Sequence, residues 1–162
     1  FGIVDRFEDF CSLQQTKEEE VGLSRMMAGF AWKWETKNNK DAFDIVIEGI
    51  PKRWNSTQKD WVNSANAVNE VGCIHTVQGY DLNYGFVILG PDIYYDSNKD
   101  AVNVNRANFK DAVAKKKASD DDLQKIIVNA YYVLMTRGML GTYLYVCDPA
   151  LKEYLSRYIP AI

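Results

Sequence analysis

Residues 72–89 read GCIHTVQGYDLNYGFVIL and give the clearest indication of the fold. Gly72–His75 and Phe86–Leu89 are short apolar runs of the kind that form buried strands. The residues between them are more polar and contain Gly79, which is typical of a connection. We therefore expect two strands of a sheet with a functional motif in the connection between them.

The rest of the chain continues this alternation of helices and buried strands. Helices are expected over Asp5–Glu20, from Ser119 to Leu134 and after Asp148, and strands over Arg25–Trp32 and Thr142–Cys147. Strands that alternate with helices predict an α/β fold, with a mainly parallel sheet and helices on both faces.

Two further segments have the composition of β-hairpin insertions. Phe43–Glu48 ends at a glycine and is followed by Pro51 and Arg53-Trp54, which suggests a β-ribbon. Ile93–Tyr95 and Ala101–Val104 flank a polar turn. In the basic segment Phe109–Ala118, the run Lys115-Lys116-Lys117 is expected to be a solvated face.

Composition limits the class of protein. A chain of 162 residues fits one domain, residues 1–162, with a substantial core. The net charge of −3 argues against a surface that coats nucleic acid through bulk charge, but leaves a local groove open. No apolar run reaches the length of a membrane span, so no membrane partner is expected. Three separated cysteines and one histidine favour reduced thiols in a cytoplasmic protein over a zinc site. Because the chain opens with Phe1 directly into structured sequence, we expect it to be a piece of a longer protein.

Arg137 is the first candidate catalytic residue. It follows a predicted helix in the string Leu134-Met135-Thr136-Arg137-Gly138 and precedes an apolar strand. Such a placement can hold a guanidinium rigidly at a domain edge, where it can meet the charge that develops on a transferred γ-phosphoryl group. The alternative is an arginine that pairs with a carboxylate at a helix end.

A second group of polar residues follows the strand that ends near Cys73. His75, Thr76, Gln78 and Asp81 are expected at the carboxyl end of that strand, where ligands gather in open α/β sheets. Asp81 could accept a hydrogen bond from a ribose hydroxyl or hold the arginine. For His75, the alternative is a satisfied, partly buried side chain.

Four tryptophans lie near basic residues and could stack on single-stranded bases, or could simply form core with a solvated rim. They are Trp32, Trp34, Trp54 and Trp61. The sequence has no Gly-x-x-x-x-Gly-Lys-Ser/Thr string and no Asp-Glu pair at a strand end, so it offers neither a phosphate-cradling loop nor a magnesium carboxylate.

The strings around Gln78 and Arg137 resemble the fifth and sixth motifs of superfamily 1 helicases. The whole chain is similar to the C-terminal part of the domain-of-unknown-function 2075 family, also described as the Schlafen group 3-like DNA/RNA helicase domain. The segments that carry the resemblance are Gly22–Trp34, Arg53–Asn55, Glu70–Tyr84 and Leu134–Asp148.

This resemblance implies a RecA-like three-layer domain that is the second, C-terminal motor domain of a helicase-like ATPase. Arg137 would be the arginine finger. The residues expected to face nucleotide are Gln78, Gly79, Asp81 and Thr136, and those expected to couple to nucleic acid are His75, Thr76 and Trp54. ATP and magnesium would bind only in the full-length protein, together with an upstream RecA-like domain. The fourth helicase motif would precede Phe1, and Arg25 is not a safe substitute for its arginine.

Three functions follow as hypotheses. The first is a motor fragment that acts on single-stranded DNA or RNA, inactive alone and without tightly bound nucleotide. The second is a non-catalytic module that binds nucleic acid or protein. The third is a metal-dependent nuclease or other hydrolase built on His75, Asp81 and Asp92.

Overall fold

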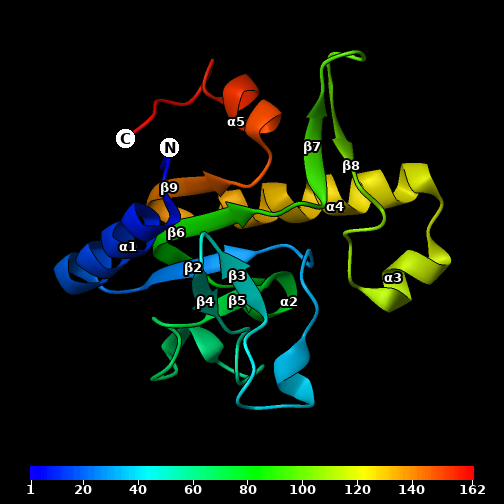
Figure 1. Ribbon diagram of the computed structural model, residues 1–162. Coiled ribbons are helices and arrows are strands. Elements are labelled where there is room, and N and C mark those ends of the chain that lie inside the picture. Colours follow the sequence, from blue (N-terminus) through cyan, green and yellow to red (C-terminus); the bar gives the residue numbers. More distant parts are fainter.

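A five-stranded, entirely parallel sheet forms the centre of the protein (Figure 1), in a computed structural model that describes residues 1–162. Its strand order is β1-β9-β6-β2-β5. The strands are β1 (Gly2–Ile3), β2 (Ser24–Ala28), β5 (Val71–Cys73), β6 (Leu82–Leu89) and β9 (Gly138–Val146). Helices cover both faces, so the predicted three-layer α/β architecture of a RecA-like domain is confirmed.

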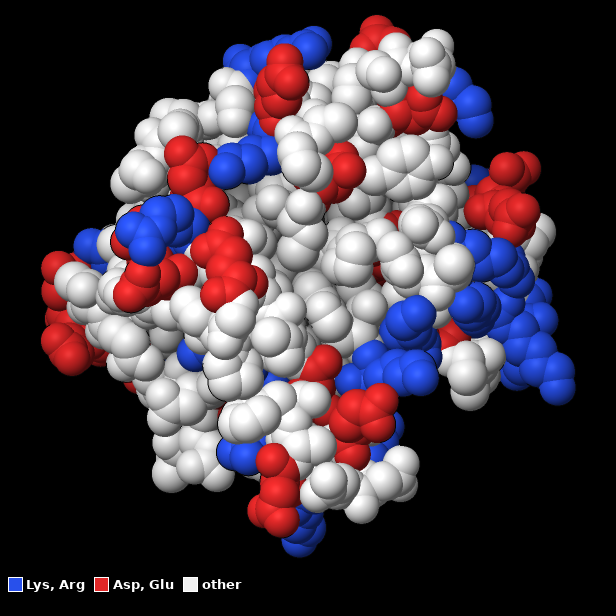
Figure 2. All heavy atoms as spheres, in the orientation of Figure 1, with Lys and Arg blue, Asp and Glu red and all other residues white.

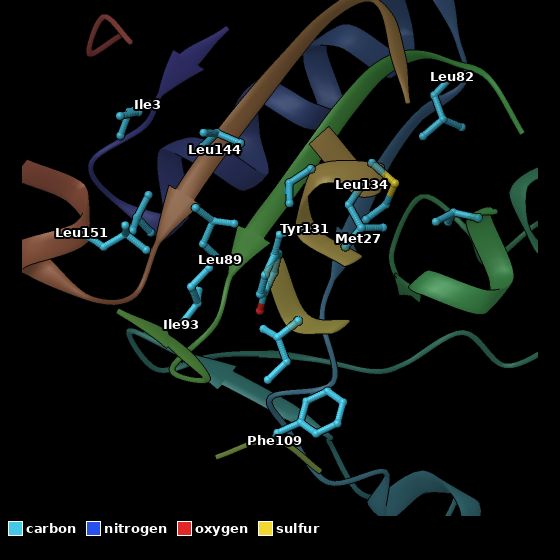
Figure 3. Close-up of a cluster of buried hydrophobic side chains, with 14 of the residues drawn as sticks. Ile3, Met27, Leu82, Leu89, Ile93, Phe109, Tyr131, Leu134, Leu144 and Leu151 are labelled. Carbon is cyan, nitrogen blue, oxygen red and sulfur yellow. The ribbon is translucent and has the colours of Figure 1, made fainter. Parts of the chain in front are cut away.

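Alternate residues of the central strands face opposite layers, as the two-residue period of a strand requires. Helix α1 (Phe7–Val21) packs Phe7 and Phe10 on the face that carries Met26 and Phe86. The other face, which includes Met27, is covered by three helices. They are α2 (Ile74–Val77), α4 (Asp120–Met135) and α5 (Pro149–Leu155). Figure 3 shows this second cluster, in which Tyr131 and Leu134 of α4 lie with Met27 and Leu144 of the sheet.

Helix α4 begins where the sequence predicts. The hydroxyl of Ser119 accepts a hydrogen bond from the backbone N–H of Asp122, at 3.2 Å. Such a cap contributes about 1 kcal/mol to helix stability. Leu123, Ile127, Tyr131 and Leu134 are the buried face of the helix and hold it against β2 and β6.

Two antiparallel hairpins confirm the predicted insertions. One joins β3 (Ile45–Ile47) to β4 (Ile50–Lys52), and the other joins β7 (Ile93–Asp96) to β8 (Ala101–Val104). The β7–β8 hairpin extends away from the sheet (Figure 1). The 3₁₀ turns η1 (Glu35–Lys37) and η2 (Trp61–Asn63) lie in the longer connections.

Two local predictions were wrong, and a third segment has structure that was not predicted. The strand expected over Arg25–Trp32 ends at Ala28. The lysines expected to form a solvated face belong to an unpredicted short helix, α3 (Ala112–Lys117), which has no buried residue and is capped by the carboxylate of Asp111, an acceptor for two backbone N–H groups of its first turn. Lys and Arg side chains gather on the α3 side of the molecule (Figure 2). Finally, β6 starts at Leu82, four residues before the expected strand, which changes where the candidate site lies.

Candidate functional site

The two motif segments lie side by side because their strands are neighbours. β6 pairs with β9, and Leu82 is in register with Gly138. The backbone N–H of Leu82 donates to the carbonyl oxygen of Arg137, at 2.9 Å. Asp81 and Arg137 therefore each precede the first residue of adjacent parallel strands.

This edge of the sheet is not the one that the sequence suggested. Asp81 and Arg137 lie at the amino ends of β6 and β9, whereas we expected the motif after Cys73 to lie at a carboxyl end. The reason is that α2 has only four residues, and the chain then returns to the opposite edge before β6 begins. His75 and Thr76, in the single turn of α2, stay close to the carboxyl end of β5.

Arg137 follows the end of α4, is held by the last turn of that helix and is only half-buried. Its Nε donates to the carbonyl oxygen of Val133 at 3.1 Å, and its Nη2 lies 3.5 Å from the hydroxyl of Thr136. Arg137 forms no ion pair within the chain, so the alternative of a helix-end arginine bonded to a carboxylate is not what the structure has. Part of the guanidinium thus remains available to another group.

Gly138 fixes the backbone directly after the arginine. A Cβ atom at this position would lie 2.1 Å from the carbonyl oxygen of Gly141 and 2.7 Å from the backbone nitrogen of Gly85. Because both neighbours are backbone atoms of paired strands, only glycine fits. This close approach holds Arg137 at the end of β9.

The other residues expected to face nucleotide are all exposed. They are Gln78, Gly79, Asp81 and Thr136. Gly79 has φ of +90°, a conformation that L side chains rarely adopt, although its surroundings are open. Gly79 thus allows the backbone to bend, and Gln78 and Asp81 on either side of it are exposed.

Of the three residues expected to contact nucleic acid, only His75 is exposed. Thr76 is buried, and its hydroxyl lies 3.1 Å from the sulfur of Cys73. Trp54 is 1% exposed and packs against Phe30, Trp32 and Trp34. A base cannot stack on a ring enclosed in this way, and the Nε1–H of Trp54, which has no partner within the chain, is buried as well.

Arg25 has a structural role. It is 5% exposed, forms an ion pair with Glu18 at 2.7 Å and donates from Nε to the carbonyl oxygen of Val62 at 2.8 Å. These bonds occupy the guanidinium and tie β2 to α1 and η2.

The residues of the nuclease hypothesis are only partly brought together. His75 and Asp92 line one cavity, but Asp81 does not line it, and no group of three His, Cys, Asp or Glu side chains could hold a metal ion.

Asp92 is fully buried, and burial raises its pKa from 3.8 to about 6. The hydroxyl of Tyr131 donates to Asp92 Oδ1 at 2.6 Å and accepts from the backbone N–H of Gly90 at 3.0 Å. This pair could not be predicted from a local pattern because its two residues are 39 positions apart.

A family model described as "Schlafen group 3, DNA/RNA helicase domain" matches residues 1–148. The chain belongs to this family. It is also 35% identical over 150 residues to "Uncharacterized protein YPL245W" of Saccharomyces cerevisiae, an alignment that covers 87% of this chain and 33% of that protein. The chain thus spans about a third of the length of this relative. No solved structure matches the chain. None of its helices combines the length and apolar character needed to span a bilayer.

Proposed function

We propose that this Schlafen group 3 helicase domain is the second motor domain of an ATPase that acts on single-stranded DNA or RNA. Arg137 is its arginine finger, and Gln78, Asp81 and Thr136 flank the nucleotide. The phosphates and magnesium are held by an upstream RecA-like domain of the longer protein. The chain alone does not hydrolyse ATP.

One observation carries this proposal. The hydrogen bond from Leu82 N–H to the carbonyl oxygen of Arg137 joins the two segments that resemble helicase motifs, although they are 55 residues apart. It supports a composite site in which Asp81 and Arg137 face the same partner from one edge of the sheet. The sequence has no phosphate-cradling loop, so this edge is suited to complete a nucleotide site rather than to form one.

Steady-state ATP hydrolysis tests the proposal. In the longer protein, Arg137→Ala lowers kcat by roughly 10³–10⁵-fold and leaves nucleotide affinity nearly unchanged, because an arginine finger acts on the transition state. Arg157→Ala is a matched control, since Arg157 is exposed near the end of the chain and lies over the ring of Tyr154. Robust hydrolysis by the 162-residue chain alone, lost in Arg137→Ala, would contradict the proposal.

A second candidate is a non-catalytic module that binds single-stranded nucleic acid, and a polar cavity of about 490 Å³ favours it. Lys37, Lys40 and Arg53 line this cavity together with Trp34. Trp34 is half-buried, and a cationic groove beside an aromatic ring is typical of single-strand binding.

Fluorescence titration of the 162-residue chain with an oligothymidylate tests this candidate. The module predicts salt-dependent quenching that is weakened by the double substitution Lys37→Gln, Lys40→Gln and unaffected by Lys99→Gln on the distant β7–β8 hairpin. If the chain alone binds no oligonucleotide, the candidate is rejected.

A further inference from the structure

A cavity of about 290 Å³ lies between α2 and α4. Its walls are mainly apolar, and this size is near the lower end of small-molecule pockets, which hold roughly 300–1,000 Å³. The residues that matter for its chemistry are Phe30, His75, Asp92, Phe109, Asp111 and Tyr131.

Asp92 gives this cavity an unsatisfied acceptor. The residue is fully buried, and its Oδ1 accepts the hydroxyl of Tyr131, but its Oδ2 has no hydrogen-bond partner. Buried carboxylate oxygens are almost always hydrogen-bonded, because an unpaired one forfeits its hydration without replacement. An N–H donor that enters the cavity would remove this cost.

The charge of the lining indicates which donor fits. Asp111 also lines the cavity, and its Oδ1 is already engaged by the backbone N–H groups of Val113 and Ala114. The lining thus contains two acidic residues and no lysine or arginine. The nearby Lys110 turns its ammonium to the carbonyl oxygen of Ala107 instead.

The apolar walls define the rest of the ligand. Phe30, Phe109 and Tyr131 contribute aromatic rings, which favour apolar groups and also attract a cation over their faces. Ile126 and Ala130 of α4 add aliphatic surface. A ligand with a charged nitrogen at one end and an apolar stem satisfies both parts of the lining.

We propose that this cavity binds a cationic nitrogen carried on an apolar stem, with the nitrogen directed to Asp92. The nitrogen can belong to a small organic amine or to a lysine or arginine side chain that another polypeptide segment inserts. The recognition is the same in both cases, and only the source differs.

The position of the cavity gives such a ligand a regulatory role, an extension that rests on the proposed function. His75 and Gln78 line it on one side, and Val133, whose carbonyl oxygen holds the guanidinium of Arg137, lines it on the other. An occupant is therefore in contact with both segments that flank the proposed nucleotide edge. Binding itself does not depend on that function and can be measured in the absence of ATP.

Two-dimensional NMR titration of the ¹⁵N-labelled 162-residue chain at pH 7.5 tests the binding. Benzylamine supplies the free amine, N-acetyl-arginine amide the side-chain source, and benzyl alcohol the neutral control of the same shape. We expect saturable shifts confined to α2, α4 and residues near Asp92 with at least one cation, and at least tenfold weaker binding of benzyl alcohol. The cation that binds more tightly identifies the source.

Variants separate this site from non-specific binding. Asp92→Asn, which keeps an acceptor for Tyr131, weakens binding of the cation at least tenfold, and Ala130→Trp fills the cavity and abolishes it. Asp121→Asn is the matched control, since Asp121 is exposed in the first turn of α4 and does not line the cavity. Equal affinity for benzyl alcohol, unchanged affinity in both cavity variants, or no saturable shift with either cation would overturn the proposal. None of these results depends on whether Arg137 acts in hydrolysis.

Discussion

Replacement of Asp92 by asparagine is expected to change how the stability of the protein depends on pH. Burial raises the pKa of Asp92 in the folded protein from 3.8 to about 6, so the folded state favours the protonated carboxyl. A raised folded-state pKa contributes stability that is complete below about pH 4 and is lost as the pH rises through 6. The difference between the two pKa values corresponds to roughly 3 kcal/mol at neutral pH.

Asparagine has nearly the same shape, stays neutral at every pH and can still accept the hydroxyl of Tyr131. The free energy of unfolding of Asp92→Asn, relative to that of the unaltered protein, should therefore rise by up to roughly 3 kcal/mol between pH 4 and pH 7.5. Urea unfolding followed by tryptophan fluorescence measures both proteins at each pH, with the m-value as a check that unfolding remains two-state. Asp121→Asn serves as the control and should leave the pH dependence unchanged. A stability difference between Asp92→Asn and the unaltered protein that is the same at pH 4 and pH 7.5 would refute the reasoning.

Three further predictions concern the framework of the site. Gly79→Ala should lower the free energy of unfolding by about 1 kcal/mol, because only its positive φ disfavours alanine. Gly138→Ala should lower it by about 3 kcal/mol or more, because the added Cβ would collide with backbone atoms. Urea titration measures both variants, and a larger loss for Gly79→Ala than for Gly138→Ala would show that the strand pairing at Gly138 is loose. Arg25→Ala should cost about 1–3 kcal/mol because it removes the guanidinium that donates to Glu18 and to the carbonyl oxygen of Val62, and a loss below about 0.5 kcal/mol in the same assay would show that these bonds contribute little. Burial raises the pKa of Cys147 to about 12, so iodoacetamide at pH 8 should modify this thiol slowly until urea unfolds the chain. Equally fast modification of Cys147 in the folded and unfolded chains would contradict the raised pKa.

The layers of the fold could be predicted from the sequence because the core strands are apolar runs. Phe86–Leu89 is buried on both faces and is recognisable without any tertiary information. The start of the same strand cannot be recognised in this way, because Asn83 and Tyr84 read as loop residues. In the structure, the side-chain amide of Asn83 donates to the carbonyl oxygens of Val21 and Gly22, and this long-range contact holds the polar end of the strand in the sheet.

The candidate site was predictable in its residues but not in its arrangement. The segments around Gln78 and Arg137 can be selected from their composition and resemblance, whereas their contact depends on β6 and β9 being neighbours, which no local pattern determines. Burial of Thr76 and Trp54 likewise depends on packing partners far away in the chain. The hydrogen bond between Tyr131 and Asp92 joins residues 39 apart, so no local sequence pattern indicates the acidic cavity.

The most direct measurement of the central claim is the position of Arg137 in the longer protein bound to magnesium, ADP and aluminium fluoride, which mimics the transferred phosphoryl group. We expect the guanidinium of Arg137 within hydrogen-bonding distance, about 3 Å, of a fluoride of that mimic, with Gln78 and Asp81 beside the nucleotide. A structure in which the nucleotide is fully enclosed while Arg137 faces solvent or another surface would contradict it.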